Sequence, residues 1–427
     1  MRTSSLIGHV IEIYSLFAAN PERPADNYIR VFFFERKYLG SKDRRFIADA
    51  FFGIVKYFRR LDAIVRDVMP EAAEDPASIV AAYFAVIEPI APRELSDEWR
   101  MIAMRERQDI SLEAFVAMAS SAREIERLSA LTPMERLAIA YSFPDWFVVK
   151  MSEEYGADKV EEILNALNDQ APTVLRANRL LVRSRDELAK ELDSEACETR
   201  ISSLAEDALI LPKRMNVQGT KAFKRGAFEV QDEASQLVAP LANLPRKTVK
   251  VLDACAGAGG KTLHIAALLE NQGEIFATDT DPRKLIELKK RARRSGAQNI
   301  RIVQPDERQH FLKRKSGWFD LVLLDVPCTG TGTLRRNPGI KSVLTELMLT
   351  ELVEKQRFIL EENAHFVAVG GVLLYATCSL LKEESEDQAN WLLSKFPGEF
   401  ELEEAIRTRP DLEGCDGFYA ARIRRVK

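Results

Sequence analysis

Two cysteines lie in short loops that each follow a predicted β-strand. Cys328 stands in the segment Asp325-Val-Pro-Cys328-Thr-Gly after the apolar run 319–324, and Cys378 stands in Ala-Thr-Cys378-Ser after the run 371–375. A cysteine in a Pro/Thr/Ser/Gly loop at a strand end is partly accessible, so its thiolate can act as a nucleophile. The two segments therefore predict a thiol nucleophile that is accompanied by a second thiol.

A glycine-rich loop, 253–261, follows a third apolar run, 249–252. Glycines at such a point let the backbone approach a bound ligand closely. The loop lacks the Gly-x4-Gly-Lys-Ser/Thr spacing of a P-loop, and it matches the dinucleotide fingerprint Gly-x-Gly-x-x-Gly poorly. Its glycines indicate a cofactor site, and a dehydrogenase is only weakly supported.

Four aspartates stand at or just after the ends of four consecutive predicted strands: Asp253, Asp279, Asp306 and Asp325. Ligands of parallel α/β sheets bind beyond the carboxyl ends of the strands, and an acid placed like Asp279 accepts hydrogen bonds from ribose hydroxyls. Any one aspartate is more often a helix cap or a turn residue. All four together suit a cofactor with a ribose, an adenine amine and a cationic amino acid, which S-adenosylmethionine combines.

The thiols narrow the methyl acceptor. A methyl group bound for oxygen or nitrogen needs only a base, whereas carbon 5 of a pyrimidine is not nucleophilic. A thiolate that adds to carbon 6 makes an enamine that can attack the methyl, and a second group then removes the carbon 5 proton so that the thiol can leave.

Cys197, Cys255 and Cys415 are expected to be buried packing residues. The four histidines form no cluster, so neither a zinc site nor a Cys-His hydrolase is predicted.

The elements that must position these residues alternate between strand and helix. Apolar runs at 249–252, 274–277, 300–303, 321–324 and 372–375 are separated by helical stretches. This order predicts an α/β fold with a mostly parallel, Rossmann-like sheet covered on both faces.

The first part of the chain has a different pattern. Apolar residues recur at helical spacing from Phe46 to Val65, in an element that we expect to begin near Gly40–Asp43 and to end at Pro70. Helical patterns continue over 77–131. We predict an all-α domain at 1–142, a small α/β connector at 143–232 and the catalytic domain at 233–427.

Composition excludes several classes of protein. The 427 residues are 46% hydrophobic and 30% charged, with no run long enough to span a membrane and no signal-peptide pattern. Five cysteines do not make a disulfide framework, so a cytosolic protein is expected.

The net charge of −4 does not favour binding to nucleic acid, yet residues 281–315 carry twelve Lys/Arg against four Asp/Glu. Local basic patches of this kind bind phosphates or are simply solvated helix faces.

The two cysteine segments, together with 226–235 and 253–261, resemble the paired motifs of RNA cytosine-5 methyltransferases, the Sun/NSUN superfamily. The basic helical region Lys42 to Arg60 is similar to the NusB-like extension of the bacterial RsmB (Fmu) branch, which methylates small-subunit ribosomal RNA. The resemblance implies S-adenosylmethionine as cofactor, ribosomal RNA as partner and a monomer. It implies that Cys378 is the nucleophile, that Cys328 assists product release, and that Asp325 contacts the base near ring nitrogen 3 and the cofactor.

The same resemblance assigns the remaining site residues. The cofactor is expected to contact Ala254, Cys255, Ala256, Gly257, Gly259, Gly260, Lys261, Asp279, Arg283, Asp306 and Asp325. The candidates for contact with RNA phosphates are Lys213, Arg214, Lys221, Lys224, Arg335 and Arg336.

Two segments depart from the family pattern. The usual Ala-Pro-Gly-Gly-Lys is Gly257-Ala-Gly-Gly-Lys261 here, and the usual Arg-Arg-His-Pro-Asp is Arg335-Arg-Asn-Pro-Gly339, which puts local substrate contacts in doubt. Two alternatives remain open. A non-enzymatic ribosome-assembly factor is disfavoured because Cys378 and the Gly-Gly-Lys loop are present. A DNA cytosine methyltransferase is disfavoured by the second cysteine, since the Pro-Cys cysteine is itself the nucleophile in those enzymes, and by the helical N-terminus.

Overall fold

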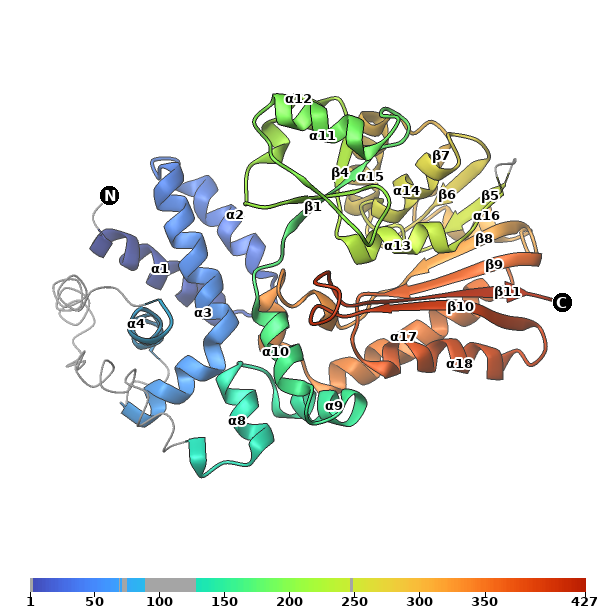
Figure 1. Cartoon of the computed structure of the whole chain (residues 1–427). Helices are drawn as coiled ribbons and strands as arrows, with labels where there is room; N and C mark the ends of the chain where they lie inside the picture. The colour runs from blue at the N-terminus through green and yellow to red at the C-terminus, as the bar shows by residue number, and fades with distance from the viewer. Residues whose placement is uncertain (1–2, 69, 71–74, 89–127, 246–248) are drawn as a thin grey trace. The chain divides into compact units, whose positions relative to one another are not determined.

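The computed structural model describes all of the chain except residues 1–2, 69, 71–74, 89–127 and 246–248. The chain divides into two compact units (Figure 1). One contains 1–169 together with 334–346, and the other contains 170–333 together with 347–427. The predicted boundaries near residues 142 and 232 stay a prediction. The segment 334–346, which follows the Pro-Cys loop in the chain, clusters with the N-terminal helices.

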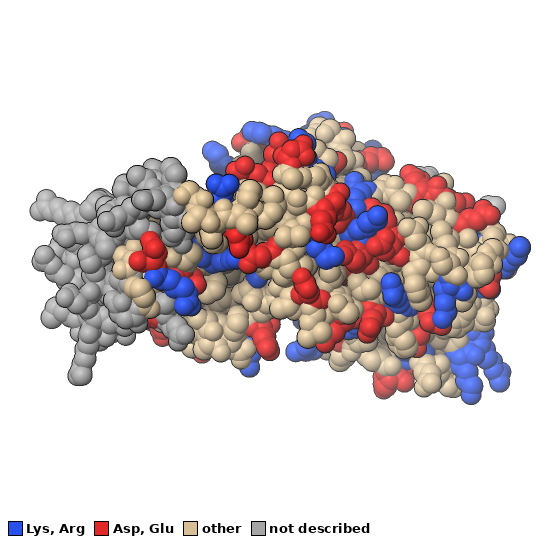
Figure 2. All heavy atoms as spheres, turned by 90° about the horizontal axis from the view of Figure 1, so that it is seen from below, with Lys and Arg blue, Asp and Glu red and all other residues tan. Residues whose placement is uncertain are grey.

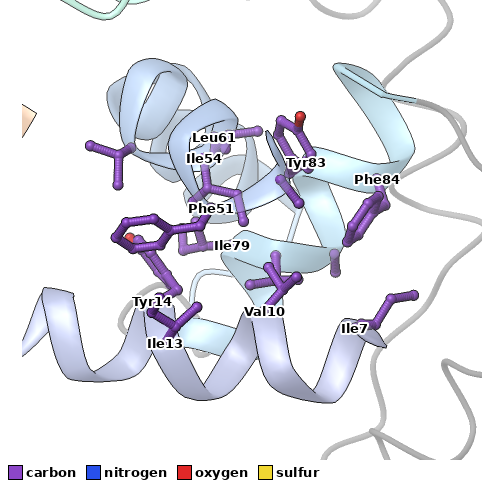
Figure 3. Close-up of a cluster of buried hydrophobic side chains, with 14 of the residues drawn as sticks. Ile7, Val10, Ile13, Tyr14, Phe51, Ile54, Leu61, Ile79, Tyr83 and Phe84 are labelled. Carbon is purple, nitrogen blue, oxygen red and sulfur yellow. The ribbon is translucent and has the colours of Figure 1, made fainter. Parts of the chain in front are cut away.

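The helical unit contains α1 (Thr3–Ala18), α2 (Ala25–Glu35), α3 (Ser41–Val68), α4 (Pro76–Val86), α8 (Pro133–Ala140), α9 (Asp145–Tyr155) and α10 (Val160–Asn168). Helix α3 begins where the sequence predicts, and Asp43 Oδ2 accepts a hydrogen bond from Gly40 N at 3.2 Å. Of the predicted helical pattern at 77–131, the part at 89–127 lies outside the described residues. Figure 3 shows the core of this unit, where Val10 and Tyr14 of α1 face Phe51 of α3 and Ile79 of α4.

The inserted segment 334–346 is held in the helical unit by a buried cation. Lys341, in the short helix η4 (Pro338–Ser342), donates to Asn168 Oδ1 at 2.5 Å and to Tyr141 O at 3.1 Å. Its ammonium also lies 3.7 Å from the Phe143 ring centroid. Burial lowers the pKa of Lys341 well below its usual value. Lys341 therefore anchors the segment in the interior of this unit, while other residues of the segment, such as Asn337 and Ser342, are exposed.

The second unit begins with a four-stranded antiparallel sheet in the order β2-β3-β1-β4. Its strands are β1 (Thr173–Ala177), β2 (Arg200–Ile201), β3 (Ala208–Leu211) and β4 (Phe228–Val230), and its helices are α11 (Arg185–Ser194), η2 (Val217–Gly219) and α12 (Lys221–Lys224). Mixed short strands and helices are what the sequence predicts for this region.

The main sheet has seven strands in the order β10-β11-β9-β8-β5-β6-β7. The strands from β9 to β7 in this order are parallel, whereas β11 is antiparallel to both of its neighbours. They are β5 (Lys250–Asp253), β6 (Glu274–Ala277), β7 (Ile300–Ile302), β8 (Phe319–Asp325), β9 (Val367–Thr377), β10 (Phe400–Thr408) and β11 (Phe418–Arg425). The predicted α/β class and parallel sheet are confirmed, and β10 and β11 are additions.

Helices cover both faces of this sheet, as the uninterrupted apolar strands require. Figure 1 shows α17 (Glu346–Ala364) and α18 (Glu386–Lys395) along one face and α13 (Glu233–Leu241) and α14 (Gly260–Leu268) along the other. Helices α15 (Pro282–Ser295) and α16 (Arg308–Leu312) complete the parallel crossovers. Val322 packs into the cluster beneath α17, and Leu323 packs into the cluster beneath α14. Adjacent residues of β8 thus pack into the hydrophobic cores on opposite faces of the sheet.

The surface mixes both signs of charge, and Figure 2 shows Lys/Arg and Asp/Glu side chains interspersed over the visible face. Among the described helices, none is both long and apolar enough to cross a membrane. Within the same described residues, no three His, Cys, Asp or Glu side chains are grouped as metal ligands.

Candidate active site

The two predicted loop cysteines meet at the carboxyl ends of adjacent strands. Strands β8 and β9 run parallel with Asp325 opposite Ala376, so the loops that follow them leave the sheet side by side. Cys328 Sγ and Cys378 Sγ lie 3.4 Å apart. The hydrogen bond with Cys378 and burial hold the pKa of the Cys328 thiol well above its usual value. Cys328 is therefore a protonated thiol at neutral pH.

The glycine-rich loop connects β5 to α14, and its path depends on two glycines with positive φ. Gly259 has φ +89°, and a Cβ there would lie 2.1 Å from Leu288 Cδ1 in the packed interior. Gly257 has φ +53°, and a Cβ there would meet nothing within 4 Å. The loop is thus packed on one side at Gly259 and open at Gly257, which leaves backbone accessible to a ligand.

Asp279 supports the open part of this loop. Its Oδ2 accepts a hydrogen bond from Gly257 N at 2.9 Å, and its Oδ1 accepts one from Asp281 N at 2.8 Å. Asp279 itself is 9% exposed, so its carboxylate faces the loop. The predicted acid after β6 is therefore hydrogen-bonded to the predicted glycine-rich loop after β5.

Lys261 joins the cofactor loop to the cysteine side. Its Nζ lies 2.8 Å from Asp325 Oδ2 and 4.8 Å from the ring centroid of Phe418. The Lys261 side chain is buried, whereas that of Asp325 is 35% exposed. Asp325 ends β8 just before Cys328. This ion pair places a carboxylate with one accessible side between the glycine-rich loop and the thiols.

Asp253 lies under the cofactor loop as a buried carboxyl. Thr262 Oγ1 donates to its Oδ2 at 2.6 Å, and its Oδ1 has no hydrogen-bond partner among the described residues. Burial raises the pKa of Asp253 from 3.8 to about 7. Asp253 therefore keeps its proton to a higher pH than an exposed aspartate does.

Two arginines hold carbonyl groups of the cofactor loop from outside it. Arg291 of α15 donates to Ala258 O at 2.8 Å, and Arg176 of β1 donates to Gly260 O at 2.8 Å. Glu229 of β4 pairs with Arg291 at 2.9 Å, and Gln231 accepts from Arg176. The predicted motif at 226–235 thus contributes residues that brace the cofactor loop through these arginines.

Several predicted cofactor residues are more exposed than this group. Asp306 follows β7 and is exposed, and the Arg283 side chain is 87% exposed and pairs with Asp281 at 2.9 Å. Cys255 is predicted to be a buried packing residue and is half-buried instead, in the loop that follows β5. Cys197 and Cys415 are buried as predicted.

The candidate phosphate contacts fall into two groups. Lys213, Arg214, Lys221 and Lys224 are exposed on the smaller sheet's loops and on α12. Arg335 is only 6% exposed and Arg336 is half-buried, and both belong to the segment that clusters with the helical unit. Exposure suited to phosphate contact is thus found at the first four positions.

Sequence patterns did not reveal the residues that link the two cysteine loops. Glu384, in the short helix η5 (Lys382–Glu384), accepts hydrogen bonds from Thr329 and Ser379, the residues that follow the two cysteines. Gln356 of α17 also donates to Glu384. An acid shortly after the Thr-Cys-Ser motif is visible in the sequence, but no local feature separates Glu384 from its neighbour Glu383.

Comparison with known proteins gives two family matches, at 143–218 and at 241–424. Residues 241–424 match the family model described as 16S rRNA methyltransferase RsmB/F. Residues 143–218 match the one described as the RsmF/B-like ferredoxin-like domain.

Individual relatives cover most of the chain. Ribosomal RNA small subunit methyltransferase B of Sodalis glossinidius is 30% identical over 90% of this chain and 90% of its own length. The protein of the same name from Shewanella oneidensis is 29% identical over 91% of this chain and 92% of its own. Among solved structures, PH0851 aligns over 99% of both chains with a TM-score of 0.78 and 26% identity.

Proposed function

Because the chain belongs to the RsmB/F family of 16S rRNA methyltransferases, we propose that it methylates carbon 5 of a cytosine in small-subunit ribosomal RNA through a covalent bond to Cys378. The observation that carries this proposal is the contact of two thiols at 3.4 Å beside the Lys261–Asp325 ion pair. Transfer to nitrogen or oxygen would need a base but no thiol.

The residues around the glycine-rich loop fit S-adenosylmethionine. Gly257 offers open backbone, Asp279 offers carboxylate oxygens to ribose hydroxyls, and Asp325 has an accessible side for the amino group or the base. We assign the adenine contact to Asp306, which is exposed after β7. When bound, S-adenosylmethionine supplies a methyl group on a positively charged sulfur, which is the electrophile of the reaction.

The chain's own residues must make carbon 5 nucleophilic. We assign attack on carbon 6 to the Cys378 thiolate, because Cys378 stands in the Thr-Cys-Ser motif whose cysteine is the nucleophile in the family that the chain resembles. Asp325 can hold a proton at ring nitrogen 3 as the ring becomes an enamine. After methylation a base takes the carbon 5 proton, and the electrons of that C–H bond re-form the double bond between carbons 5 and 6. The bond between carbon 6 and Cys378 Sγ breaks with its electron pair on sulfur, so Cys378 leaves as a thiolate. Cys328 is the thiol beside that bond, and we assign it to this release step.

The target cytosine has to leave its base stack to reach the thiols, so we expect an unpaired or flipped-out nucleotide. We propose that exposed Lys213, Arg214, Lys221 and Lys224 contact phosphates of the same RNA. Arg335 and Arg336 stay candidates for this role.

A product assay tests the proposal. The protein is incubated with 16S rRNA and methyl-labelled S-adenosylmethionine, and the digested nucleosides are identified by mass spectrometry. We expect 5-methylcytidine from the wild type and from Cys197→Ala, a control at a buried cysteine. Cys378→Ala should lose at least about a thousandfold in rate. A methyl group on a ring nitrogen, on a ribose or only on DNA of the same sequence would contradict the proposal.

A further inference from the structure

A single buried carboxylate joins the two cysteine loops. Glu384 has no solvent exposure. Its Oε1 accepts from Thr329 N at 2.9 Å and from Gln356 Nε2 at 3.0 Å. Its Oε2 accepts from Ser379 Oγ at 2.6 Å and from Thr329 Oγ1 at 2.5 Å. Burial raises the pKa of Glu384, and each of these donors acts in the opposite direction by stabilising the ionised form.

The partners of Glu384 are the immediate neighbours of the reacting thiols. Thr329 follows Cys328 in the chain, and Ser379 follows Cys378. Gln356 also donates to Pro327 O at 2.9 Å, so the Pro-Cys loop is held on both sides of its cysteine. A shift of the Glu384 carboxylate would therefore move both loops.

Further contacts fix the place of Glu384 and the path of the loops. Tyr375 of β9 donates to Glu384 O at 2.8 Å, which ties η5 to the strand that ends just before Cys378. Thr331 Oγ1 accepts from Leu380 N at 2.9 Å, and Gly332 N donates to Cys378 O at 3.0 Å. The backbones of the two loops are thereby connected directly as well as through the carboxylate.

We propose that Glu384 is a positioning residue that sets the separation of the Cys328 and Cys378 thiols. Neither thiol is a hydrogen-bond partner of Glu384, so Glu384 would act on the thiols through Thr329 and Ser379. The catalytic consequence rests on the proposed function, whereas the distance between the thiols is a property of the folded chain. Displacement of a reacting group by about 1 Å can lower a rate about a hundredfold.

Glu384→Gln is the informative variant because it keeps the shape of the side chain and replaces one acceptor oxygen with a donor NH2 group. That group would face the hydroxyls of Thr329 and Ser379, which would have to turn from donors into acceptors. The charge-assisted hydrogen bonds would also become weaker neutral ones, so the loops should separate. Glu383→Gln is the matched control, since it removes one carboxylate from the neighbouring position.

The thiol separation is measured without RNA. Diamide oxidises the two thiols to a disulfide, and its nitrogen–nitrogen double bond takes up the two electrons and both thiol protons. Formation of the Cys328–Cys378 disulfide is followed by peptide mass mapping. We expect the wild type and Glu383→Gln to cross-link at the same rate and Glu384→Gln to cross-link at least about tenfold more slowly. A rate at or above that of the wild type would overturn the proposal.

Methyl transfer is measured on the same proteins. Glu384→Gln should lower kcat by about 10- to 100-fold and leave the KM for S-adenosylmethionine within about twofold, because its contacts lie outside the cofactor loop. Slow cross-linking with a normal kcat would overturn the catalytic part of the proposal. Slow cross-linking when even the wild type methylates no RNA would support the positioning role and contradict the proposed function.

Two milder variants decide the question if Glu384→Gln does not fold. Thr329→Val and Ser379→Ala each remove one donor and keep the carboxylate. We expect each to slow disulfide formation by about threefold, with unchanged far-ultraviolet circular dichroism. Wild-type rates in both folded variants would show that the carboxylate does not control the distance between the thiols.

Discussion

The cofactor loop and the cysteine loops lie at the same edge of one sheet, but they are held by different means. The cofactor loop follows a backbone path set by Gly257 and Gly259, and arginines from β1 and α15 hold its carbonyl groups. The cysteine loops are held by side chains that converge on Glu384. We therefore expect a change in backbone conformation to have a large effect on cofactor binding when it lies in the cofactor loop. Loss of one side chain should have a large effect only in the cysteine loops.

The largest effect expected in the cofactor region comes from a glycine. Gly259→Ala would strain a residue at φ +89° and push a Cβ to 2.1 Å from Leu288 Cδ1. Such strain and overpacking together cost about 2–5 kcal/mol. We expect urea unfolding to show this loss in unfolding free energy and calorimetry to show cofactor binding weakened at least about tenfold.

Gly257→Ala separates the effect of backbone strain from the effect of overpacking. A Cβ at Gly257 meets nothing within 4 Å, so only the strain at φ +53° and the space taken from the ligand remain. We expect Gly257→Ala to weaken cofactor binding with a smaller loss of stability than Gly259→Ala. Equal losses of stability in the two variants would contradict the packed and open sides of this loop.

Asp253, the buried carboxyl of the cofactor region, makes the stability of the fold depend on pH. Its folded-state pKa is raised to about 7, so the native state retains a proton that the unfolded state loses above pH 3.8. Stability from this group is therefore full below about pH 3.8 and is lost as pH rises to about 7. The slope is at most about 1.4 kcal/mol per pH unit.

Asp253→Asn removes this titration. We expect the stability of the variant relative to the wild type to increase between pH 4 and pH 7 and to become constant at higher pH. Urea unfolding at a series of pH values measures the difference. A difference that does not change with pH would mean that the folded-state pKa of Asp253 is not raised.

The smallest effect is expected from a bracing arginine. Arg291→Met removes the hydrogen bond to Ala258 O, while Glu229 keeps its pairing with Arg294 and Arg176 still holds Gly260 O. We expect cofactor binding to weaken by only about threefold, the value of one partly exposed hydrogen bond. A loss as large as that from Gly259→Ala would show that this loop depends on one side chain, and the contrast between the regions would fail.

Periodicity and strand-end logic predict most of the catalytic sheet. The five parallel strands are short apolar runs, and parallel packing brings residues that follow them to one edge. This is why Asp279, Asp325, Cys328 and Cys378 could be expected near one another from the sequence. The edge strand β10 was missed because the run Glu401–Ala405 is exposed and largely acidic, so it has no alternating apolar pattern.

Other features depend on contacts between distant segments and leave no local signal. Lys341 reads as a surface lysine in the sequence, yet it is buried against Asn168 and Phe143. Arg176 holds Gly260 from a different sheet. Glu384 differs from Glu383 only in the direction of its side chain, which the turn η5 decides.

The most direct test of the proposed division between the cysteines is a trapping experiment. Cys328→Ala is mixed with 16S rRNA and S-adenosylmethionine and run on a denaturing gel. If Cys378 attacks and Cys328 assists release, this variant accumulates a covalent RNA–protein adduct, and the Cys328→Ala/Cys378→Ala variant accumulates none. Intact methylation without an adduct, or an adduct that persists in the double variant, would contradict this division of roles.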